Sequence, residues 1–436
     1  MSYPEALAVP NVGPVSAAER LVSLDTLRGV AVMGILVMNV YAFAMPLAAY
    51  YNPLIMGGSD ALNMGVWFFT HLFFDQKFMS IFSMLYGAGV VMMMDRAEAR
   101  GAAFAPLFYR RSAWLLLLGL LHAYFIWFGD ILFHYALMGM AVFLLRRAAP
   151  KTLIIVAGFM LPVALLFNFA GSFYMEELQA DVAGIEARLA QGATLDAEQQ
   201  RKLDEWREIR PLFAPSDEDI AAEVAAYRGS YVDTLTQRAP FVAFMQVNLT
   251  LVFVVWRVGG LMLLGMALMK LGVLSGERST RFYRNLAMVG YGAGLPLAVL
   301  SALLLEAHGF DPIYVARFGG IPNYVGSILV AFGHIGAVML VVKSGALRAI
   351  VDRFAAVGRM ALSNYLAHSL LMTSLFYGYG LGLYADVPRL WQQALVVAVV
   401  ALQLLISPWW LKHFRFGPAE WLWRSLSYRQ RQPMRR

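Results

Sequence analysis

The sequence predicts an all-α protein: a polytopic membrane helical bundle of about ten transmembrane helices, with one helical insert outside the membrane. Hydrophobic residues make up 60% of the 436 positions and charged residues only 14%, and the mean hydropathy is +0.60. Several apolar runs reach about 20 residues, the length that a helix needs to cross a bilayer. A soluble chain of this length could not bury so much apolar surface, so the membrane class follows.

Ten segments have the composition of spanning helices. They lie at about residues 22–45, 77–94, 112–128, 131–145, 152–171, 241–269, 286–306, 323–342, 360–380 and 391–411. Residues 61–74 are also apolar, but Asp75-Gln76-Lys77 separates them from the second helix. We expect an interfacial or re-entrant segment there, because a further full crossing would invert the charge pattern described below. Whether this segment spans, re-enters or lies at the interface stays open.

Residues 172–240 differ in composition from the rest of the chain. Positions 172–238 hold 14 of the 28 carboxylates and only 7 Lys or Arg. Breaks are expected at Gly192-Ala193-Thr194 and between Pro211 and Pro215, and Ser216 with Asp219 has the spacing of a capping box. The stretch therefore predicts an acidic insert of amphipathic helices that faces water.

The chain thus divides into five parts. They are an N-terminal tail (1–21), a first transmembrane block (22–171), the acidic extracytoplasmic insert (172–240), a second transmembrane block (241–411) and a basic C-terminal tail (412–436). Residues 1–20 lack the basic segment and cleavage site of a signal peptide, so the first apolar segment is expected to remain as a helix.

Basic residues fall on alternate loops of this ten-helix arrangement. One set of loops contains Arg96, Arg100, Arg110, Arg111, Arg146, Arg147, Lys151, Lys270, Arg278, Arg281, Arg284, Lys343, Arg348, Arg353 and Arg359. The opposite short loops hold only Arg317 and Arg389. By the positive-inside rule, both termini are expected in the cytoplasm, and the protein in a bacterial inner membrane.

The first helix carries three polar side chains. Asp25 and Arg28 lie on one face, and Asn39 returns to within about 20° of Arg28 on a helix of 100° per residue. Ionisable groups cost about 2.5 kcal/mol or more at the centre of a spanning helix, so they usually face the protein interior. Two interpretations stay open: a ligand-binding face, and a buried ion pair that only fixes helix packing.

The third helix and the turn after it contain a second polar set. Arg111 and His122 share a face about 16 Å apart along the axis, and Asp130 follows in the turn to the next helix. We expect Arg111 at the cytoplasmic mouth and His122 near the middle of the membrane, where a histidine suits general-base or proton-relay chemistry. The alternative is a neutral histidine that binds the carbonyl of a neighbouring helix.

Further polar side chains lie in the second block. Arg359, Asn364 and His368 occur together at the start of the ninth helix, with Asn364 and His368 at i, i+4. Arg257 lies deep in the sixth helix and needs a partner, for which Asp25, Asp130 or a ligand anion qualify. For Gln246, Asn323 and His334 we expect interhelical hydrogen bonds.

Several kinds of chemistry are excluded. The chain has no cysteine, so disulfides, thiolate metal sites and thiol nucleophiles are absent. His71 and Asp75 stand at i, i+4 without a recognisable third ligand, and we expect no metal site. No Walker loop, Rossmann fingerprint, GxSxG elbow or HExxH motif occurs. The basic residues lie in loops, where they set membrane orientation, so no nucleic-acid partner is expected.

Motifs spread over nearly the whole chain resemble the YeiB-like family of bacterial inner-membrane proteins. The stretches are Leu24-Asp25 with Leu27-Arg28-Gly29, Phe82-Ser83-Met84-Leu85-Tyr86-Gly87-Ala88-Gly89, His122 with Gly129-Asp130-Ile131-Leu132, Leu264-Gly265-Met266-Ala267-Leu268, Gly358-Arg359-Met360-Ala361-Leu362-Ser363-Asn364-Tyr365-Leu366, and Gly417-Pro418 with Glu420-Trp421-Leu422-Trp423-Arg424. His368 departs from the glutamine expected at its position, and His334 matches no family motif.

More remotely, the first helix resembles that of transmembrane acyltransferases, which move acyl groups from cytoplasmic acyl-CoA to acceptors across the bilayer. In the sugar O-acetyltransferases of that group, the position of Asn39 is a catalytic histidine. Here the loop 40–60 has no histidine either, so the resemblance implies a different base, and His122 is the candidate.

This resemblance leads to a first hypothesis, a membrane acyltransferase with no cofactor and acyl-CoA as co-substrate. The catalytic candidates are His122 as base, Asp130 to orient it and Asn39, with Arg257, for the oxyanion. The candidate substrate-binding residues are Asp25, Arg28, Arg111, Arg257, Arg359, Asn364 and His368. Arg110 joins the arginines that would bind the CoA phosphates.

Two other hypotheses stay open. One is a transporter, flippase or transport-associated protein in which the same side chains line a path. The other is a non-catalytic scaffold whose acidic insert binds an envelope partner. The expected partners are the lipid bilayer, an acyl-CoA donor and an envelope glycan or lipid acceptor, and a homo-oligomer is compatible with the sequence. The substrate, the acyl donor and the role of the insert are left open.

Overall fold

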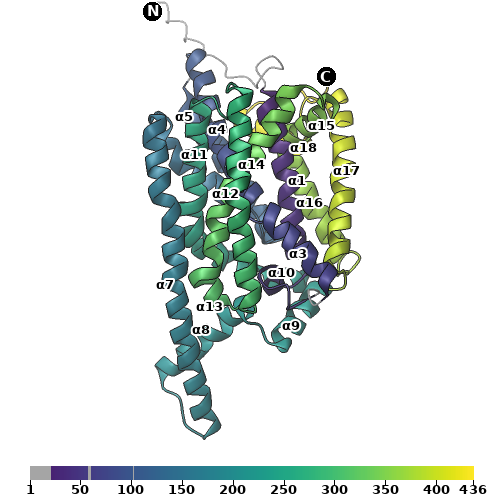
Figure 1. The fold of residues 1–436 in the computed structure, drawn as a ribbon. Coiled ribbons are helices and arrows are strands. Elements are labelled where there is room, and N and C mark those ends of the chain that lie inside the picture. Colours follow the sequence, from purple (N-terminus) through teal and green to yellow (C-terminus); the bar gives the residue numbers. More distant parts are fainter. Residues whose placement is uncertain (1–20, 57–59, 102) are drawn as a thin grey trace, which may run out of the picture.

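The computed structural model describes residues 21–56, 60–101 and 103–436. Nearly all of the predicted N-terminal tail, residues 1–20, lies outside these ranges. Within them the regular structure is helical (Figure 1), and the only β-type pairing is one isolated bridge between Phe414 and Arg435. The predicted all-α fold is confirmed.

The helices follow one another through short connections. In chain order they are α1 (Val22–Ala44), α2 (Leu47–Tyr51), α3 (Ala61–Phe73), α4 (Lys77–Ala99), α5 (Phe104–Phe125), α6 (Leu132–Val142), η1 (Phe143–Leu145), α7 (Pro150–Ala190), α8 (Ala197–Phe213), α9 (Asp217–Arg228), α10 (Tyr231–Leu249), η2 (Thr250–Val258), α11 (Gly259–Lys270), α12 (Thr280–Ala307), α13 (Pro312–Tyr314), η3 (Val315–Gly319), α14 (Gly320–Ser344), α15 (Arg348–Arg359), α16 (Ala361–Phe376), α17 (Arg389–His413) and α18 (Pro418–Tyr428).

All ten predicted segments are helical. Eight continuous helical stretches in the described part of the chain are long and apolar enough to cross a membrane. The shorter pair α6–η1 and the helix α16 account for the other two predicted segments. The bundle is therefore of the membrane-protein type by length and composition.

Helix α1 lies in the interior of the bundle. Its apolar window is 78% buried inside the protein, against 17% for α7 and 22% for α17. It packs against α4, α14, α15, α16 and α17. An inner helix contacts protein on all sides, so the polar side chains of α1 face other helices and not lipid.

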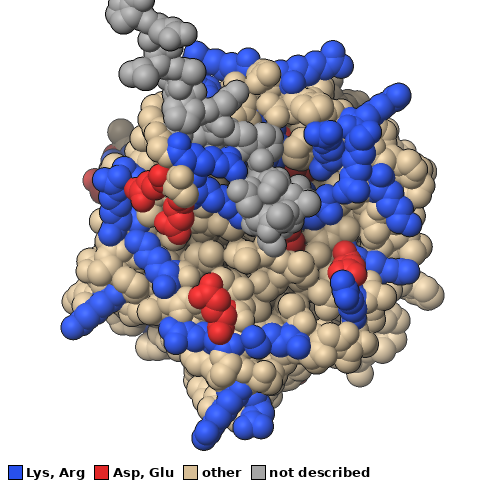
Figure 2. Space-filling view, turned by 90° about the horizontal axis from the view of Figure 1, so that it is seen from above, with Lys and Arg blue, Asp and Glu red and all other residues tan. Residues whose placement is uncertain are grey.

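The two ends of the bundle differ in charge. The N-terminal end of α1 and the C-terminus lie at the same end (Figure 1), and Lys and Arg dominate that surface with few acidic residues (Figure 2). We call this end, where α1 begins and α18 lies, the basic face. The insert helices α8 and α9 lie at the opposite end (Figure 1), which we call the insert end.

The insert is continuous with the bundle. Residues 171 and 172, the expected boundary, lie inside α7, which runs unbroken to Ala190; the other boundary, 240–241, lies inside α10. A helix can pass from the membrane into water where its side chains change from apolar to polar. Gly171 at this point does not end α7, because one glycine costs a helix only about 1 kcal/mol relative to alanine. The capping box at Ser216 and Asp219 is confirmed.

Helix α9 of the insert docks on the bundle through Glu223. Its Oε1 atom accepts hydrogen bonds from the Leu47 backbone N–H at 3.2 Å and from the Tyr384 hydroxyl at 2.9 Å. Burial raises the pKa of the Glu223 carboxyl above its ordinary value, because these two bonds, which lower it, do not offset the loss of water. The insert is thus fixed to the connections after α1 and α16.

Helices α3 and α4 together form one apolar helical stretch, Ala61–Ala99, that is long enough to cross a membrane and contains a break. Asn63 in the first turn of α3 accepts a hydrogen bond from Leu390 N at the start of α17, and α4 ends near the basic face. The break falls at residues 74–76, where Gln76 has a left-handed φ of 62°. Discontinuous helices of this kind bring backbone and polar groups into the interior of a bundle.

Candidate functional site

A cavity of about 290 Å³ opens between α1, α4, α5, α16 and α18. Its size is close to the lower end of the range for small-molecule pockets. Its described lining includes six arginines and two carboxylates. They are Arg28, Arg96, Arg111, Arg359, Arg415 and Arg424, with Asp25 and Glu420. Basic side chains therefore exceed acidic ones, and the cavity suits an anionic ligand.

Two of these arginines have contacts that fix their direction. Arg28 lies on the second turn of α1 and donates to Asp25 Oδ1 at 2.9 Å. The guanidinium of Arg111 lies 4.1 Å from the centre of the Trp423 ring, and such stacking holds the charge in place while leaving edge donors for a ligand. Asp25, Arg28, Arg111 and Arg359, which the sequence analysis predicted for substrate binding, thus lie around one cavity.

The C-terminal helix α18 forms one wall of the cavity. The Glu420 carboxylate accepts hydrogen bonds from the backbone N–H groups of Leu362 and Ser363, at 2.7 and 3.1 Å, and so caps the start of α16. The Trp423 indole N–H donates to Arg111 O at 2.8 Å. Burial raises the pKa of the Glu420 carboxyl. Arg110 does not line the cavity and binds the Ser427 carbonyl instead.

Below the arginines, the cavity is lined by apolar and tyrosine side chains. Tyr86, Tyr135 and Tyr365 reach it from α4, α6 and α16. The ring of Tyr365 lies 5.2 Å from the ring of His122, centre to centre. Tyr365 thus separates the cavity from His122, which is only 1% exposed.

His122 lies in a row of three hydrogen-bonded side chains. Its Nδ1 is 2.8 Å from Asp130 Oδ1, and its Nε2 is 2.8 Å from the Ser369 hydroxyl. When Nδ1–H donates to the carboxylate, neutral His122 leaves Nε2 to accept the Ser369 proton. All three side chains are buried. This is the order of contacts found in Ser-His-Asp triads.

The local fold of the α5–α6 hairpin explains the position of Asp130. The chain turns at residues 126–131, and Asp130 Oδ2 accepts from Phe133 N at 2.7 Å at the start of α6. Gly119 lets this turn approach α5, since a Cβ there would lie 2.3 Å from Phe133 N. The sequence Gly119-x-x-His122 therefore places His122 and Asp130 side by side.

Three predicted residues of α1 and α16 have other positions. Asn39 is half-buried and is not among the described lining residues of the cavity. The Asn364 amide donates to Val357 O and to Ser407, and His368 Nε2 contacts Gln403 Oε1 at 2.7 Å. The face of α16 that carries Asn364 and His368 therefore packs on α17 and does not line the cavity.

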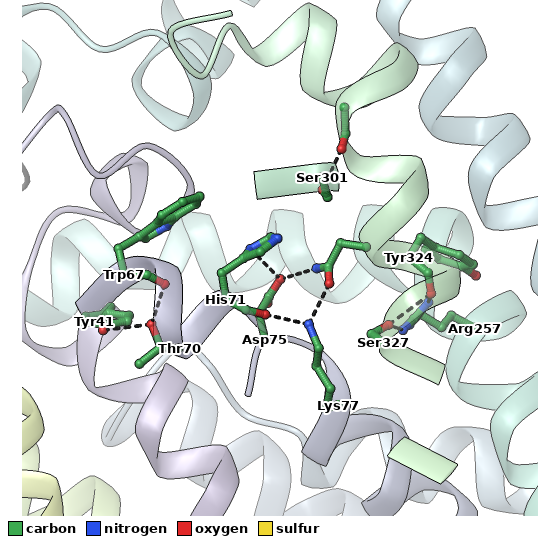
Figure 3. A network of polar contacts seen from close by, with 12 residues as sticks. Tyr41, Trp67, Thr70, His71, Asp75, Lys77, Arg257, Ser301, Tyr324 and Ser327 are labelled. Atoms are coloured by element: carbon green, nitrogen blue, oxygen red, sulfur yellow. Dashed lines mark hydrogen bonds and ion pairs between the residues drawn. The ribbon is translucent and has the colours of Figure 1, made fainter. Parts of the chain in front are cut away.

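Arg257 belongs to a separate polar cluster (Figure 3). It is fully buried and donates to Tyr324 O at 3.2 Å and to the Ser327 hydroxyl at 2.7 Å, with its guanidinium 4.0 Å from the Tyr324 ring. In the described part of the chain its hydrogen-bond partners are oxygens of α14 and of Ser80. Neither Asp25 nor Asp130 pairs with it, and a ligand anion as its partner stays a prediction.

The same cluster contains the break between α3 and α4. The Lys77 ammonium donates to His71 O and to Asn323 Oδ1, each at 2.6 Å, and the Asn323 amide donates to Asp75 at 2.6 Å. Asn323 thus joins a buried cation and a carboxylate. His334 likewise contacts Tyr291 and the Phe73 carbonyl, so the expected interhelical hydrogen bonds of Asn323 and His334 are confirmed.

Ser369 was not among the residues predicted for the site. It is adjacent to His368 but about 100° further round the helix, and it shares a face with Tyr365 at i, i+4. Its partner His122 is 247 positions away in the chain. The sequence contains one signal for this residue: Ser369 is a polar residue four positions after Tyr365, on a mostly apolar face of α16.

The fold and the cavity define a class: a polytopic helical membrane protein with a buried polar site below an arginine-lined mouth. The chain belongs to the YeiB-like family. Residues 268–430 match the family described as "Protein of unknown function (DUF418)". "Uncharacterized protein YxaH" of Bacillus subtilis is 33% identical over 97% of this chain and 98% of its own length. "Uncharacterized protein YeiB" of Escherichia coli is 32% identical over 95% and 98%.

Proposed function

We propose that this protein is a membrane acyltransferase whose donor is an anionic thioester of the acyl-CoA kind. The observation that supports this is one continuous arrangement: arginines at the mouth of a cavity, tyrosines below them, and the row of Ser369, His122 and Asp130 behind Tyr365. Guanidinium groups bind phosphates through paired, charge-assisted hydrogen bonds. An apolar chamber below them suits an acyl chain.

In this proposal the basic face lies in the cytoplasm of a bacterial inner membrane, as the distribution of Lys and Arg indicates. The phosphates of the donor bind Arg28, Arg111 and Arg359, and the acyl group extends toward Tyr365. His122 acts as general base, and Asp130 holds its Nδ1–H tautomer. Asn39 and Arg257 lie elsewhere, so the oxyanion role predicted for them is not part of this proposal.

The acceptor in this proposal is a hydroxyl or amine of an envelope glycan or lipid, which enters from the insert end. An aromatic layer covers that side of the site. The rings of Trp127 and Phe43 stack with 3.9 Å between their centres. The rings of Tyr227, in the insert, and Tyr384 stack with 4.8 Å between their centres. These rings belong to one buried cluster. The insert helix α9 would then control access of the acceptor.

The test is binding of radiolabelled acetyl-CoA and palmitoyl-CoA to the full chain in nanodiscs. We expect saturable binding that weakens as salt is raised, since ionic contacts are screened. Transfer of label to extracted envelope lipids or glycans would identify the acceptor class. No saturable binding of either thioester overturns the proposal.

A second candidate function is transport, favoured by the polar cluster at the α3–α4 break. Lys77 and Arg257 are both fully buried there, and buried cations at a helix break are typical of ion and substrate paths. Proteoliposomes with an internal pH dye test this without acyl-CoA. Proton movement in the wild-type protein that Lys77→Met abolishes supports transport, and no movement above empty liposomes excludes proton transport by this route.

A further inference from the structure

The Ser369 hydroxyl differs in its contacts from three other buried serines of the bundle. Serines in membrane helices commonly bind the carbonyl three or four residues earlier in their own helix. Ser80, Ser83 and Ser427 do so, with Gln76 O, Met79 O and Trp423 O. The hydroxyl of Ser369 is instead 2.8 Å from His122 Nε2 on another helix. In the Nδ1–H tautomer of His122, the Ser369 hydroxyl donates to Nε2.

His122 also differs from the other buried histidines. His71 is 3.6 Å from Asp75 and has no partner at Nε2 among the described residues. His334 and His368 contact neutral groups. Only His122, in the described part of the chain, lies between a carboxylate and a hydroxyl at hydrogen-bond distance on both sides. A base held in this way is the arrangement that activates a serine nucleophile.

We infer that Ser369 is a catalytic nucleophile that carries the acyl group as a covalent ester between donor and acceptor. The inference rests on the proposed function and specifies its chemistry: a double-displacement reaction in place of direct transfer. It adds a catalytic residue to the site and predicts a covalent intermediate in which the acyl group is attached to the protein.

The first half-reaction forms the ester. The Ser369 Oγ attacks the thioester carbonyl carbon, and His122 Nε2 takes the hydroxyl proton. When the tetrahedral intermediate collapses, the carbon–sulfur bond breaks and His122 returns the proton to the leaving thiolate. The products are an acyl-serine and a free thiol, with no oxidant or reductant needed.

The second half-reaction removes the acyl group. An acceptor hydroxyl or amine attacks the ester carbon while His122 takes its proton, and the proton then goes to the Ser369 oxygen as the ester bond breaks. Asp130 stabilises the imidazolium in both steps. Water in place of the acceptor would give slow hydrolysis of the donor.

Access to Ser369 depends on Tyr365. Its ring separates the cavity from His122, and its hydroxyl accepts from Ile131 N at 3.2 Å. The thioester reaches Ser369 when this ring turns aside. Tyr365→Phe keeps the ring and removes the anchoring hydroxyl, so we expect it to speed the first half-reaction relative to the wild-type protein.

A fluorophosphonate probe tests the nucleophile without reference to any donor. Such probes phosphorylate serines activated by a histidine, and peptide mapping identifies the labelled residue. We expect the probe to label Ser369 in the wild-type protein. The total labelling of the protein should fall about 100-fold or more in Ser369→Ala and in His122→Gln. Ser374→Ala is the matched control, since Ser374 is an exposed serine of the same helix, and it should label like the wild-type protein. Absence of label on Ser369 in folded protein overturns the inference.

The acyl-enzyme itself is tested with acetyl-CoA and intact-mass measurement. We expect an acetyl adduct on Ser369 in the wild-type protein and, in Ser369→Cys, a thioester that neutral hydroxylamine removes. If acetyl-CoA binds and is turned over with no adduct, or with the adduct on another residue, the inference fails while the proposed function stands. If neither acetyl-CoA nor palmitoyl-CoA binds, the proposed function fails, and label on Ser369 still supports an activated serine.

Discussion

His122 and Asp130 are in contact, with 2.8 Å between Nδ1 and Oδ1, although they belong to different sides of the α5–α6 turn. Asp130→Asn keeps an oxygen that can accept from Phe133 N, so the turn should fold. It removes the negative charge that holds the His122 tautomer. We expect kcat for acyl transfer to fall about 1000-fold or more, with the KM for the donor changed less than threefold.

Steady-state kinetics with labelled thioester, together with the thermal midpoint, test this expectation. A midpoint near that of the wild-type protein shows that the turn is intact. Unchanged kcat in such a folded variant would mean that Asp130 only supports the turn, and the proton-transfer role of His122 would lose its orienting partner.

The arginines at the mouth of the cavity should act on donor binding. Arg28→Gln removes one guanidinium from the lining while Asp25 stays. A charge-assisted contact to a phosphate contributes about 1.5–3 kcal/mol, so we expect the Kd of acyl-CoA to rise about tenfold or more and its salt dependence to weaken. Arg147→Gln is the control, because Arg147 is exposed, pairs with Glu98 at 3.0 Å and does not line the cavity.

Equilibrium binding of labelled acyl-CoA at two salt concentrations distinguishes the two variants. Equal Kd values for Arg28→Gln and Arg147→Gln would show that the basic face attracts the donor only through its overall charge. The cavity would then not be the phosphate site.

Much of the helical architecture was readable from the sequence because each helix depends on local composition. The ten apolar segments, the break before Lys77 and the capping box at Ser216 all follow from neighbours in the chain. His122 and Asp130 also lie close in sequence, and a hairpin brings them together. Local patterns thus predicted the part of the candidate site formed by one hairpin.

The remainder of the site depends on which helix faces meet, and one sequence does not specify that. Ser369 reaches His122 only because α16 meets the end of α5 at this point, and Glu420 reaches Leu362 because α18 folds back on the start of α16. Arg257 was expected to pair with Asp25, Asp130 or a ligand anion, and in the structure it binds serine and carbonyl oxygens of other helices in place of either carboxylate. The predicted boundaries of the insert do not coincide with helix ends, because α7 and α10 continue through the change in polarity.

The crossing of α1 and α15 should be sensitive to a single methyl group. A Cβ on Gly358 would lie 1.8 Å from the Asp25 carbonyl oxygen, which belongs to backbone and cannot rotate away. Small residues allow such close contact between membrane helices. Gly358→Ala should therefore separate the helices and destabilise the protein by about 2 kcal/mol or more, which lowers the thermal midpoint by several degrees.

Gly158→Ala serves as the control for this change. Gly158 lies in α7, where an added Cβ meets nothing within 4 Å, so alanine should be neutral or slightly stabilising. A thermal unfolding series of both variants in one detergent makes the comparison. Similar midpoints for the two would mean that α15 moves away from α1 at little cost.

Docking of the insert should weaken as the pH rises. Burial raises the folded-state pKa of Glu223, so the docked form binds its proton more tightly than the undocked form does. The contribution of Glu223 to docking is therefore fully present at pH values below the ordinary glutamate pKa, and it is lost as the pH rises through the raised value.

Glu223→Gln keeps an Oε1 acceptor for Leu47 N and the Tyr384 hydroxyl without the titration. We expect hydrogen exchange in residues 217–228 to quicken between pH 4 and pH 8 in the wild-type protein, after correction for intrinsic rates, and to stay level in Glu223→Gln. Identical corrected profiles for the two proteins would show that the Glu223 carboxyl does not control the docking of α9.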